Sequence, residues 1–315
     1  MIFFLSAPEM FATMLLALLL DRCCGEVRRF HPLVGFGRLA SAIEKRMNGR
    51  DASRWRGAWA WALAVVPLSA LSYFLVQSLQ LKYPILALVA HALILYFCLG
   101  LQSLTEHALV VARALQASDL VLARRLASYM VSRDTAQLNE EDLVKATVES
   151  VLENGCDAVF ASLFWFAILG APGAILARLS NTLDAMWGYR SQRYLRFGCV
   201  AARVDDVLHF IPARLTALSY ALAGHTASAI RCWRLQAAQW SSPNAGPVMA
   251  AGAGALRLQL GGAAIYQGEL EMRPILGLGA TAQTPDIERA LRLLKLAVLL
   301  WIAVGMVLVL WDLGA

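Results

Sequence analysis

Long runs of apolar residues constrain the fold of this chain more than any other feature. Runs at 2–20, 57–77, 84–101 and 294–310 approach the length that crosses a bilayer. The composition agrees, because 59% of the residues are hydrophobic and only 16% are charged, with a mean hydropathy of +0.57. We therefore expect an all-α integral membrane protein with about four transmembrane helices, together with re-entrant or interfacial helices and cytoplasmic helical segments.

Basic residues indicate how the chain is oriented. The segment from Asp21 to Arg56 is rich in arginine, so the positive-inside rule places it in the cytoplasm. The same rule makes the net charge of +6 poor support for nucleic-acid binding. Arg22 follows the opening apolar run, which favours a retained anchor over a cleaved signal peptide. We expect one membrane-embedded domain at 1–315, with its functional region at 102–292.

The six cysteines show no CxxC pair and no metal-ligand spacing, so we expect reduced thiols or small core residues. The sequence also lacks the phosphate-binding P-loop, the GxGxxG fingerprint and the HExxH zinc motif.

Polar residues concentrate between 132 and 190. A helix is predicted from about 140 to 154, because Asn139 is a favourable N-cap and Gly155 a favourable stop. Acidic residues recur on one face of it, and Glu149 and Glu153 form a like-charge pair that is unfavourable unless a cation or donor satisfies it. A functional site and a solvated charged face both remain open.

The apolar segment 158–177 contains Gly170, Pro172 and Gly173, which predict a break in the helix. The loop that follows is as basic as the loops assigned to the cytoplasm. A re-entrant or surface-lying hairpin satisfies the positive-inside rule, whereas a simple crossing violates it.

Further polar residues follow this break. Asn181 and Asp184 are predicted to share a helix face, whereas only one of Asp205 and Asp206 is expected to face a site. Carboxylates and amides suit Mg²⁺, and arginines suit phosphate or carboxylate groups. His31, in a glycine-rich loop, either binds phosphate or belongs to a loop that turns and caps a helix.

The chain also resembles the CobD/CbiB family, the adenosylcobinamide-phosphate synthases of the bacterial inner membrane. The resemblance rests on DRCCGEVRRFHPLVGFGRL at 21–39, SRDT at 132–135, ATVESVLENGCD at 146–157, NTLDAMWGYR at 181–190, ARVDDVLHFIPARLTAL at 202–218, SPNAG at 242–246 and LGGAAIYQGEL at 260–270. Several motifs in the right order make the resemblance specific.

The resemblance implies a ligase of cobalamin biosynthesis that joins adenosylcobyric acid to aminopropanol or its O-phosphate. It implies ATP and Mg²⁺ as cofactors, and a multi-pass protein of the inner membrane whose functional loops face the cytoplasm. The implied partners are the corrinoid and aminopropanol-phosphate substrates, membrane lipid and other late corrinoid-assembly enzymes of the membrane, and not nucleic acid.

Candidate site residues follow from the polar positions within these motifs. The candidate catalytic residues are Asp134, Glu149, Glu153, Asp157, Asp184 and Asp205. The candidate substrate-binding residues are His31, Arg133, Asn154, Asn181, Tyr189, Arg190, Arg214, Asn244, Tyr266 and Glu269. The candidate metal ligands are Glu153, Asp157 and Asp184.

Two departures from the family pattern stand out. Ser162 occupies a position where the family usually has proline, and Met249 lies where it usually has an acidic residue. Two other classes of function also remain open. One is a non-catalytic sensor or scaffold, similar to the beta-lactamase-regulatory membrane protein AmpE, and the other is a small-molecule transporter.

Overall fold

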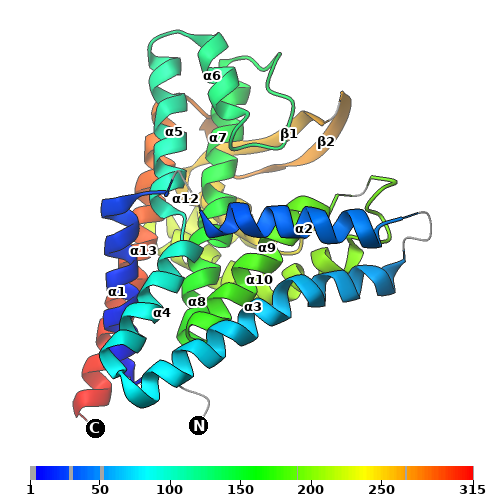
Figure 1. The fold of residues 1–315 in the computed structure, drawn as a ribbon. Helices are drawn as coiled ribbons and strands as arrows, with labels where there is room; N and C mark the ends of the chain where they lie inside the picture. The colour runs from blue at the N-terminus through cyan, green and yellow to red at the C-terminus, as the bar shows by residue number, and fades with distance from the viewer. Residues whose placement is uncertain (1–4, 28–30, 50–52, 190, 267, 315) are drawn as a thin grey trace. The chain divides into compact units, whose positions relative to one another are not determined.

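The structure is a computed structural model and is mostly helical (Figure 1). It describes residues 5–27, 31–49, 53–189, 191–266 and 268–314. By its internal contacts the chain divides into two compact units, which we describe separately. The first unit comprises Met1–Gly100, Asp157–His209 and Gly305–Ala315, and the second comprises Leu101–Cys156 and Phe210–Val304. The expectation of one membrane-embedded domain stays a prediction.

Among the residues that the structure describes, the first unit contains helices and no strand. It contains α1 (Ala7–Cys24), α2 (Pro32–Met47), α3 (Arg54–Lys82), α4 (Pro84–Cys98), most of a π-helical turn η1 (Cys156–Phe160), α8 (Ala161–Leu169), α9 (Ala171–Trp187), the beginning of α10 (Cys199–Ala223) and the end of α13 (Pro285–Gly314).

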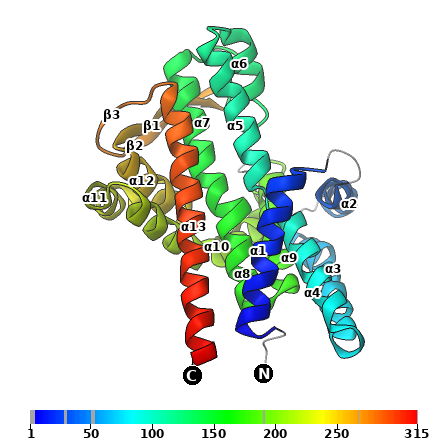
Figure 2. The same ribbon diagram turned by 90° about the vertical axis from the view of Figure 1, so that its left-hand side faces the viewer.

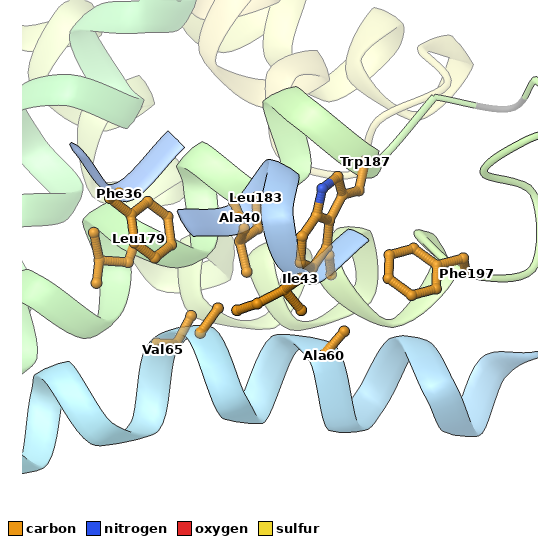
Figure 3. Close-up of a cluster of buried hydrophobic side chains, with 11 residues drawn as sticks. Phe36, Ala40, Ile43, Ala60, Val65, Leu179, Leu183, Trp187 and Phe197 are labelled. Atoms are coloured by element: carbon orange, nitrogen blue, oxygen red, sulfur yellow. The ribbon is translucent and has the colours of Figure 1, made fainter. Parts of the chain in front are cut away.

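A hydrophobic core joins α2, α3 and α9 in this unit. Figure 3 shows the side chains of the three helices pointing into one cluster. Ala40 on α2 and Ala60 and Ala64 on α3 are completely buried, and such small side chains let helices approach closely. Trp187 and Phe197 belong to the same cluster and pack edge-on against each other, with 5.1 Å between their ring centroids. This core fixes α9, which carries the candidate site residues Asn181 and Asp184.

The predicted helix break is confirmed, since α8 ends at Leu169 and α9 begins at Ala171. Gly170 between them has φ 65° and ψ −154°, a conformation that glycine adopts without strain. The amide N–H of Ala171 donates to Nδ1 of the buried His91 on α4, at 3.2 Å. The break is therefore capped by a side chain from a distant part of the sequence, and re-entry into the membrane stays a prediction.

The second unit combines helices with a small sheet. It contains α5 (Leu101–Gln116), α6 (Leu120–Ala127), α7 (Glu140–Gly155), the end of α10, α11 (Thr226–Gln236), a 3₁₀ turn η2 (Ala237–Gln239), α12 (Ala245–Leu256), β1 (Leu258–Tyr266), β2 (Glu269–Leu276), β3 (Ala280–Thr281) and most of α13.

The predicted N-cap of α7 is confirmed, whereas the predicted stop at Gly155 is wrong, because the chain continues from α7 through the π-helical turn η1 into α8. Asn139 caps α7 by accepting a hydrogen bond from the Asp142 N–H at 2.9 Å. Asp119 caps α6 in the same way, with the Leu122 N–H at 2.9 Å. Between α5 and α6 the chain turns at Ser118, whose φ of 58° ends the preceding helix.

The sheet was not predicted. β1 and β2 form an antiparallel hairpin with a bulge between Gly261 and Ala263, and β3 pairs parallel to β1. Figure 2 shows the hairpin beside α12 of the same unit. The Gly/Ala-rich stretch 250–264 reads as one segment in the sequence, but Arg257, in the left-handed conformation with φ 55°, divides it into a buried helix and a strand.

Four helical stretches are long and apolar enough to cross a membrane. They are Arg54–Lys82, Pro84–Gln116, Glu140–Leu169 and Pro285–Gly314, counted over the residues that the structure describes. This agrees with the expected all-α membrane class, to which the structure adds the small sheet of the second unit.

Three of these stretches contain the expected spans 57–77, 84–101 and 294–310. The expected first span, 2–20, is not among them. Its described part lies in α1, which also carries Asp21 and Arg22 at its end. The fourth stretch that is long and apolar enough to cross a membrane is Glu140–Leu169, which was not predicted as a span.

Candidate functional site

Polar side chains from three elements meet inside the first unit. Asp157 comes from η1, Asn181 and Asp184 come from α9, and Asp205 comes from the beginning of α10. Arg178 of α9 and His209 of α10 interact electrostatically with them. We call this set the carboxylate cluster: Asp157, Arg178, Asn181, Asp184, Asp205 and His209. Asp157 lies in a π-helical turn, a feature that is frequent at functional sites.

His209 connects two of the carboxylates. Its Nδ1 lies 3.0 Å from Oδ1 of Asp205, and its Nε2 lies 3.9 Å from Oδ1 of Asp157. The side chain is only 2% exposed. Burial acts to lower the pKa of His209, but contact with Asp205 and the charge of Asp157 outweigh it and raise the pKa to about 9. The imidazole is therefore a cation at neutral pH.

For Asp184, unlike His209, the neighbouring carboxylates disfavour the charged form of the side chain. Burial raises the pKa of its carboxyl to about 7, and the charges of Asp205, Asp157 and Asp206 act in the same direction. A carboxyl with a pKa near neutrality is suited to accept a proton in catalysis. Gly188 leaves room for it, because a Cβ there would lie 2.0 Å from an Asp184 carboxylate oxygen.

The cluster has the donor chemistry that Mg²⁺ prefers, namely carboxylate and amide oxygens, and its mutual repulsion favours a cation. Among the described residues, however, no group of three or more His, Cys, Asp and Glu side chains is arranged to hold a metal ion. Of the candidate ligands, Asp157 and Asp184 belong to the first unit and Glu153 belongs to the second.

Sequence reasoning missed Arg178 and His209 as site residues. Arg178 lies three residues before Asn181 and six before Asp184 on the same helix. His209 lies four residues after Asp205, a spacing that places the two side chains together on a helix. Spacing from the predicted acidic residues was therefore the available signal in both cases.

His31 both caps a helix and lies near the cluster. Its Nδ1 accepts a hydrogen bond from the Leu33 N–H at 3.2 Å, at the beginning of α2. Its ring packs edge-on against Phe97, with 5.8 Å between the ring centroids. Burial lowers the pKa of His31, and the nearby charge of Arg178 lowers it further against the opposing charge of Glu26.

The last two candidates of the first unit lie beyond α9. Tyr189 is 47% exposed. Arg190 lies outside the described residues.

A second group of candidates surrounds Glu149 in the second unit. Glu149 is 2% exposed and forms ion pairs with Arg133 and, at 3.0 Å, with Arg273 of β2. Its other oxygen accepts a hydrogen bond from the Gly261 N–H at 2.7 Å, and Arg273 donates to the Gly262 carbonyl at 3.1 Å. We call Arg133, Glu149 and Arg273 the buried triad. It satisfies the charge of Glu149 and holds the bulge of β1.

Asp134 holds the other end of the hairpin. Its carboxylate accepts the Gly268 N–H at 2.7 Å, and its own N–H donates to the Ile265 carbonyl at 2.8 Å. The 132–135 loop and the hairpin border a cleft of about 710 Å³. Tyr266 lies near the triad, with its hydroxyl 3.4 Å from Arg273, and Glu269 is exposed at the beginning of β2.

Arg214 fixes the SPNAG loop. It donates to the side chain of Asn244 at 2.8 Å and to the Pro243 carbonyl at 3.0 Å, and its guanidinium lies 3.6 Å from the Phe210 ring centroid. Asn154 donates to the Ser150 carbonyl at 3.0 Å, within its own helix. Glu153 is half-buried on the same helix. The catalytic and binding roles of all these residues stay predictions.

The chain was compared with known proteins. The family model described as "CobD/Cbib protein" matches residues 14–294. The cobalamin biosynthesis protein CobD of Stutzerimonas stutzeri is 57% identical over 94% of this chain and 97% of its own length. The CobD proteins of Chromobacterium violaceum (52% identity, covering 92% of this chain and 94% of the relative) and Mycobacterium tuberculosis (40%, with 88% of each chain covered) are also similar. No solved structure matches. The expected family is thereby confirmed, and the chain belongs to the CobD/CbiB family of cobalamin biosynthesis proteins.

Proposed function

We propose that this protein joins the carboxyl group of a corrinoid, adenosylcobyric acid, to the amine of aminopropanol or its O-phosphate, with ATP as the energy source and Mg²⁺ as the metal. The family supports a role in cobalamin biosynthesis, which implies a corrinoid substrate. The observation that carries the proposal further is the carboxylate cluster, which combines a carboxyl of near-neutral pKa with a buried imidazolium.

Amide formation from a carboxylate requires an activated acyl group, because oxide is not a leaving group. In the proposed reaction the corrinoid carboxylate attacks the terminal phosphorus of ATP and ADP leaves. The amine nitrogen then attacks the acyl carbon, phosphate leaves, and the nitrogen loses a proton. The net products are the amide, ADP, phosphate and the proton.

Asp184 is the base that this scheme assigns to the amine. Its carboxyl releases and accepts protons near neutral pH, because its pKa is raised to about 7 by burial and by the neighbouring carboxylates. His209 keeps a positive charge between Asp205 and Asp157 and so fixes the orientation of both side chains. When bound, Mg²⁺ would be held by Asp157 and Asn181 and would offset the negative charge of the phosphates.

The test is an assay of the detergent-purified protein with adenosylcobyric acid, aminopropanol phosphate, ATP and Mg²⁺, followed by mass spectrometry of the corrinoid. We expect a product heavier by the amine minus water, which requires ATP. Asp184→Asn should lower kcat by about 10²-fold or more, the usual contribution of a general base. Asp312→Asn, at an exposed position, is the matched control and should leave kcat unchanged.

A corrinoid that binds but is never amidated, with every co-substrate present, would refute the ligase and favour the sensor or scaffold. Loss of product in Asp312→Asn as well would indicate that the assay reports general damage to the protein. Loss in Asp184→Asn alone would support the carboxylate cluster as the reaction site.

A further inference from the structure

We propose that Arg178 and His31 form a phosphate-binding subsite beside the carboxylate cluster. The identity of the molecule that carries the phosphate rests on the proposed function, whereas the subsite itself rests on the unsatisfied polar groups of the first unit.

Arg178 is a partly buried cation whose charge is poorly satisfied by the protein. Its Nε is buried and has no hydrogen-bond partner among the described residues. None of the ion pairs found in the described part of the chain includes it. Burial lowers the pKa of Arg178, and the charges of Asp157 and Glu26 only partly oppose this. A buried donor without a partner is costly, so its retention requires an explanation such as a ligand.

The guanidinium of Arg178 lies next to the backbone that follows α4. Its terminal nitrogen Nη2 would be in van der Waals contact, at 3.9 Å, with a Cβ at Gly100. The backbone there is already fixed, because the Gly100 N–H donates to the Ala158 carbonyl at 3.1 Å. Arg178 therefore extends from α9 toward the end of α4, past the π-helical turn that carries Asp157.

His31 supplies a second donor. Its Nδ1 is occupied as an acceptor of the Leu33 N–H, so in the neutral ring the proton is on Nε2, which is then a donor. His31 packs on Phe97 of α4, three residues before the Gly100 beside which Nη2 of Arg178 lies, so both groups lie at the end of α4. The charge of Arg178 accordingly acts to lower the pKa of His31. Packing against Phe97 holds the imidazole ring in place.

Phosphate matches this pair better than a carboxylate does. A phosphate dianion offers three acceptor oxygens, enough for the two-pronged guanidinium and for one imidazole N–H together. Two phosphate groups take part in the proposed reaction: the terminal phosphate of ATP and the ester phosphate of aminopropanol phosphate. Both have this chemistry, and an experiment can separate them.

The experiment compares wild type with Arg178→Met, Arg178→Lys and the control Arg196→Met, whose arginine is exposed in the same unit. Calorimetry on the purified full chain measures binding of ATP, aminopropanol phosphate and aminopropanol separately, without corrinoid. We expect Arg178→Met to weaken one of the two phosphate ligands by about tenfold or more, the loss typical of a charge-assisted hydrogen bond. Arg178→Lys should recover only part of the lost phosphate affinity. The affinity for aminopropanol, which has no phosphate, should be the same in all variants.

The ligand that is affected identifies the source of the phosphate. Weakened ATP binding assigns the subsite to the nucleotide, and weakened aminopropanol phosphate binding assigns it to the amine substrate. The proposal is overturned if Arg178→Met binds both phosphates as wild type does, or if Arg196→Met is equally impaired. The calorimetry measures binding without turnover. A failure to form the amide in the activity assay would therefore refute the proposed ligase, but it would not decide whether Arg178 binds phosphate.

A melting temperature for each variant controls for misfolding. Removal of an unsatisfied buried cation should leave the melting temperature of Arg178→Met at or above that of wild type. His31→Ala removes the second donor and should weaken the same ligand, whereas His225→Ala, which removes another helix-capping histidine, should not.

Discussion

The buried triad gives a sharp test of whether Glu149 is a structural or a catalytic residue. Glu149→Ala would leave Arg133 and Arg273 facing each other with side chains only 8% and 7% exposed. It would also remove the acceptor of the Gly261 N–H. Removing one partner of a buried ion pair costs about 3–5 kcal/mol, because the remaining charge stays uncompensated. We therefore expect the β1–β2 hairpin to lose its attachment to α7.

The assay is thermal unfolding of the purified protein in detergent. By the scaling for domains of 150–250 residues, that loss lowers the melting temperature by about 6–20 °C. Glu149→Gln keeps an oxygen for the Gly261 N–H but loses the charge, so its decrease should be smaller. Glu271→Ala, at an exposed position on β2, is the matched control and should change stability by less than about 0.5 kcal/mol.

The reasoning is refuted if Glu149→Ala unfolds at the wild-type temperature. It is supported further if replacing all three members of the triad with apolar residues restores part of the stability, because this removes the uncompensated charges. A variant that is fully stable but inactive would instead identify Glu149 as a catalytic residue.

Three further predictions concern the first unit. The pKa of Asp184 is raised from 3.8 to about 7, so its proton stabilises the fold below about pH 4 and this contribution is lost as the pH rises through 7. Asp184→Asn should therefore gain melting temperature relative to wild type at about pH 8 but not at about pH 4, and an equal difference at both would contradict this. Mg²⁺ should raise the melting temperature of wild type more than that of Asp157→Asn, and equal rises would place its binding elsewhere. Gly170→Ala should cost about 1–3 kcal/mol in chemical unfolding, because alanine is strained at its φ of 65°, while Gly35→Ala on α2 should cost nothing.

Local signals in the sequence predicted the features that depend on neighbouring residues. The cap at Asn139 and the break at Gly170 follow from side-chain chemistry within a few positions, and the structure confirms them. The apolar runs likewise predicted most of the helices that are long enough to cross a membrane.

Contacts between distant segments were not predictable in this way. Glu149 and Arg273 are 124 positions apart, so no spacing rule connects them, and the row of acids on α7 gave no sign that two arginines neutralise one of its members. The hairpin that brings Arg273 there was missed, because glycines and alanines weaken the alternating pattern of a strand.

The departures from the family pattern have packing roles in this chain. Met249, where an acidic residue was expected, is 1% exposed in α12, a helix whose residues are all buried. Ser162 is also buried, and its hydroxyl donates to the Cys98 carbonyl at 3.2 Å, which links α8 to α4. An acidic side chain at 249 would need a partner to be buried there.

The contact between His91 and the Ala171 amide has a consequence for how the protein is made. The ribosome synthesises α4 well before α8 and α9, since the two partners are 80 positions apart. His91, the acceptor for the Ala171 N–H, is therefore already present when the hairpin of α8 and α9 leaves the ribosome. An order of synthesis that placed the hairpin first would leave this amide without its partner during assembly, so the natural order of the chain supplies the acceptor before the junction forms.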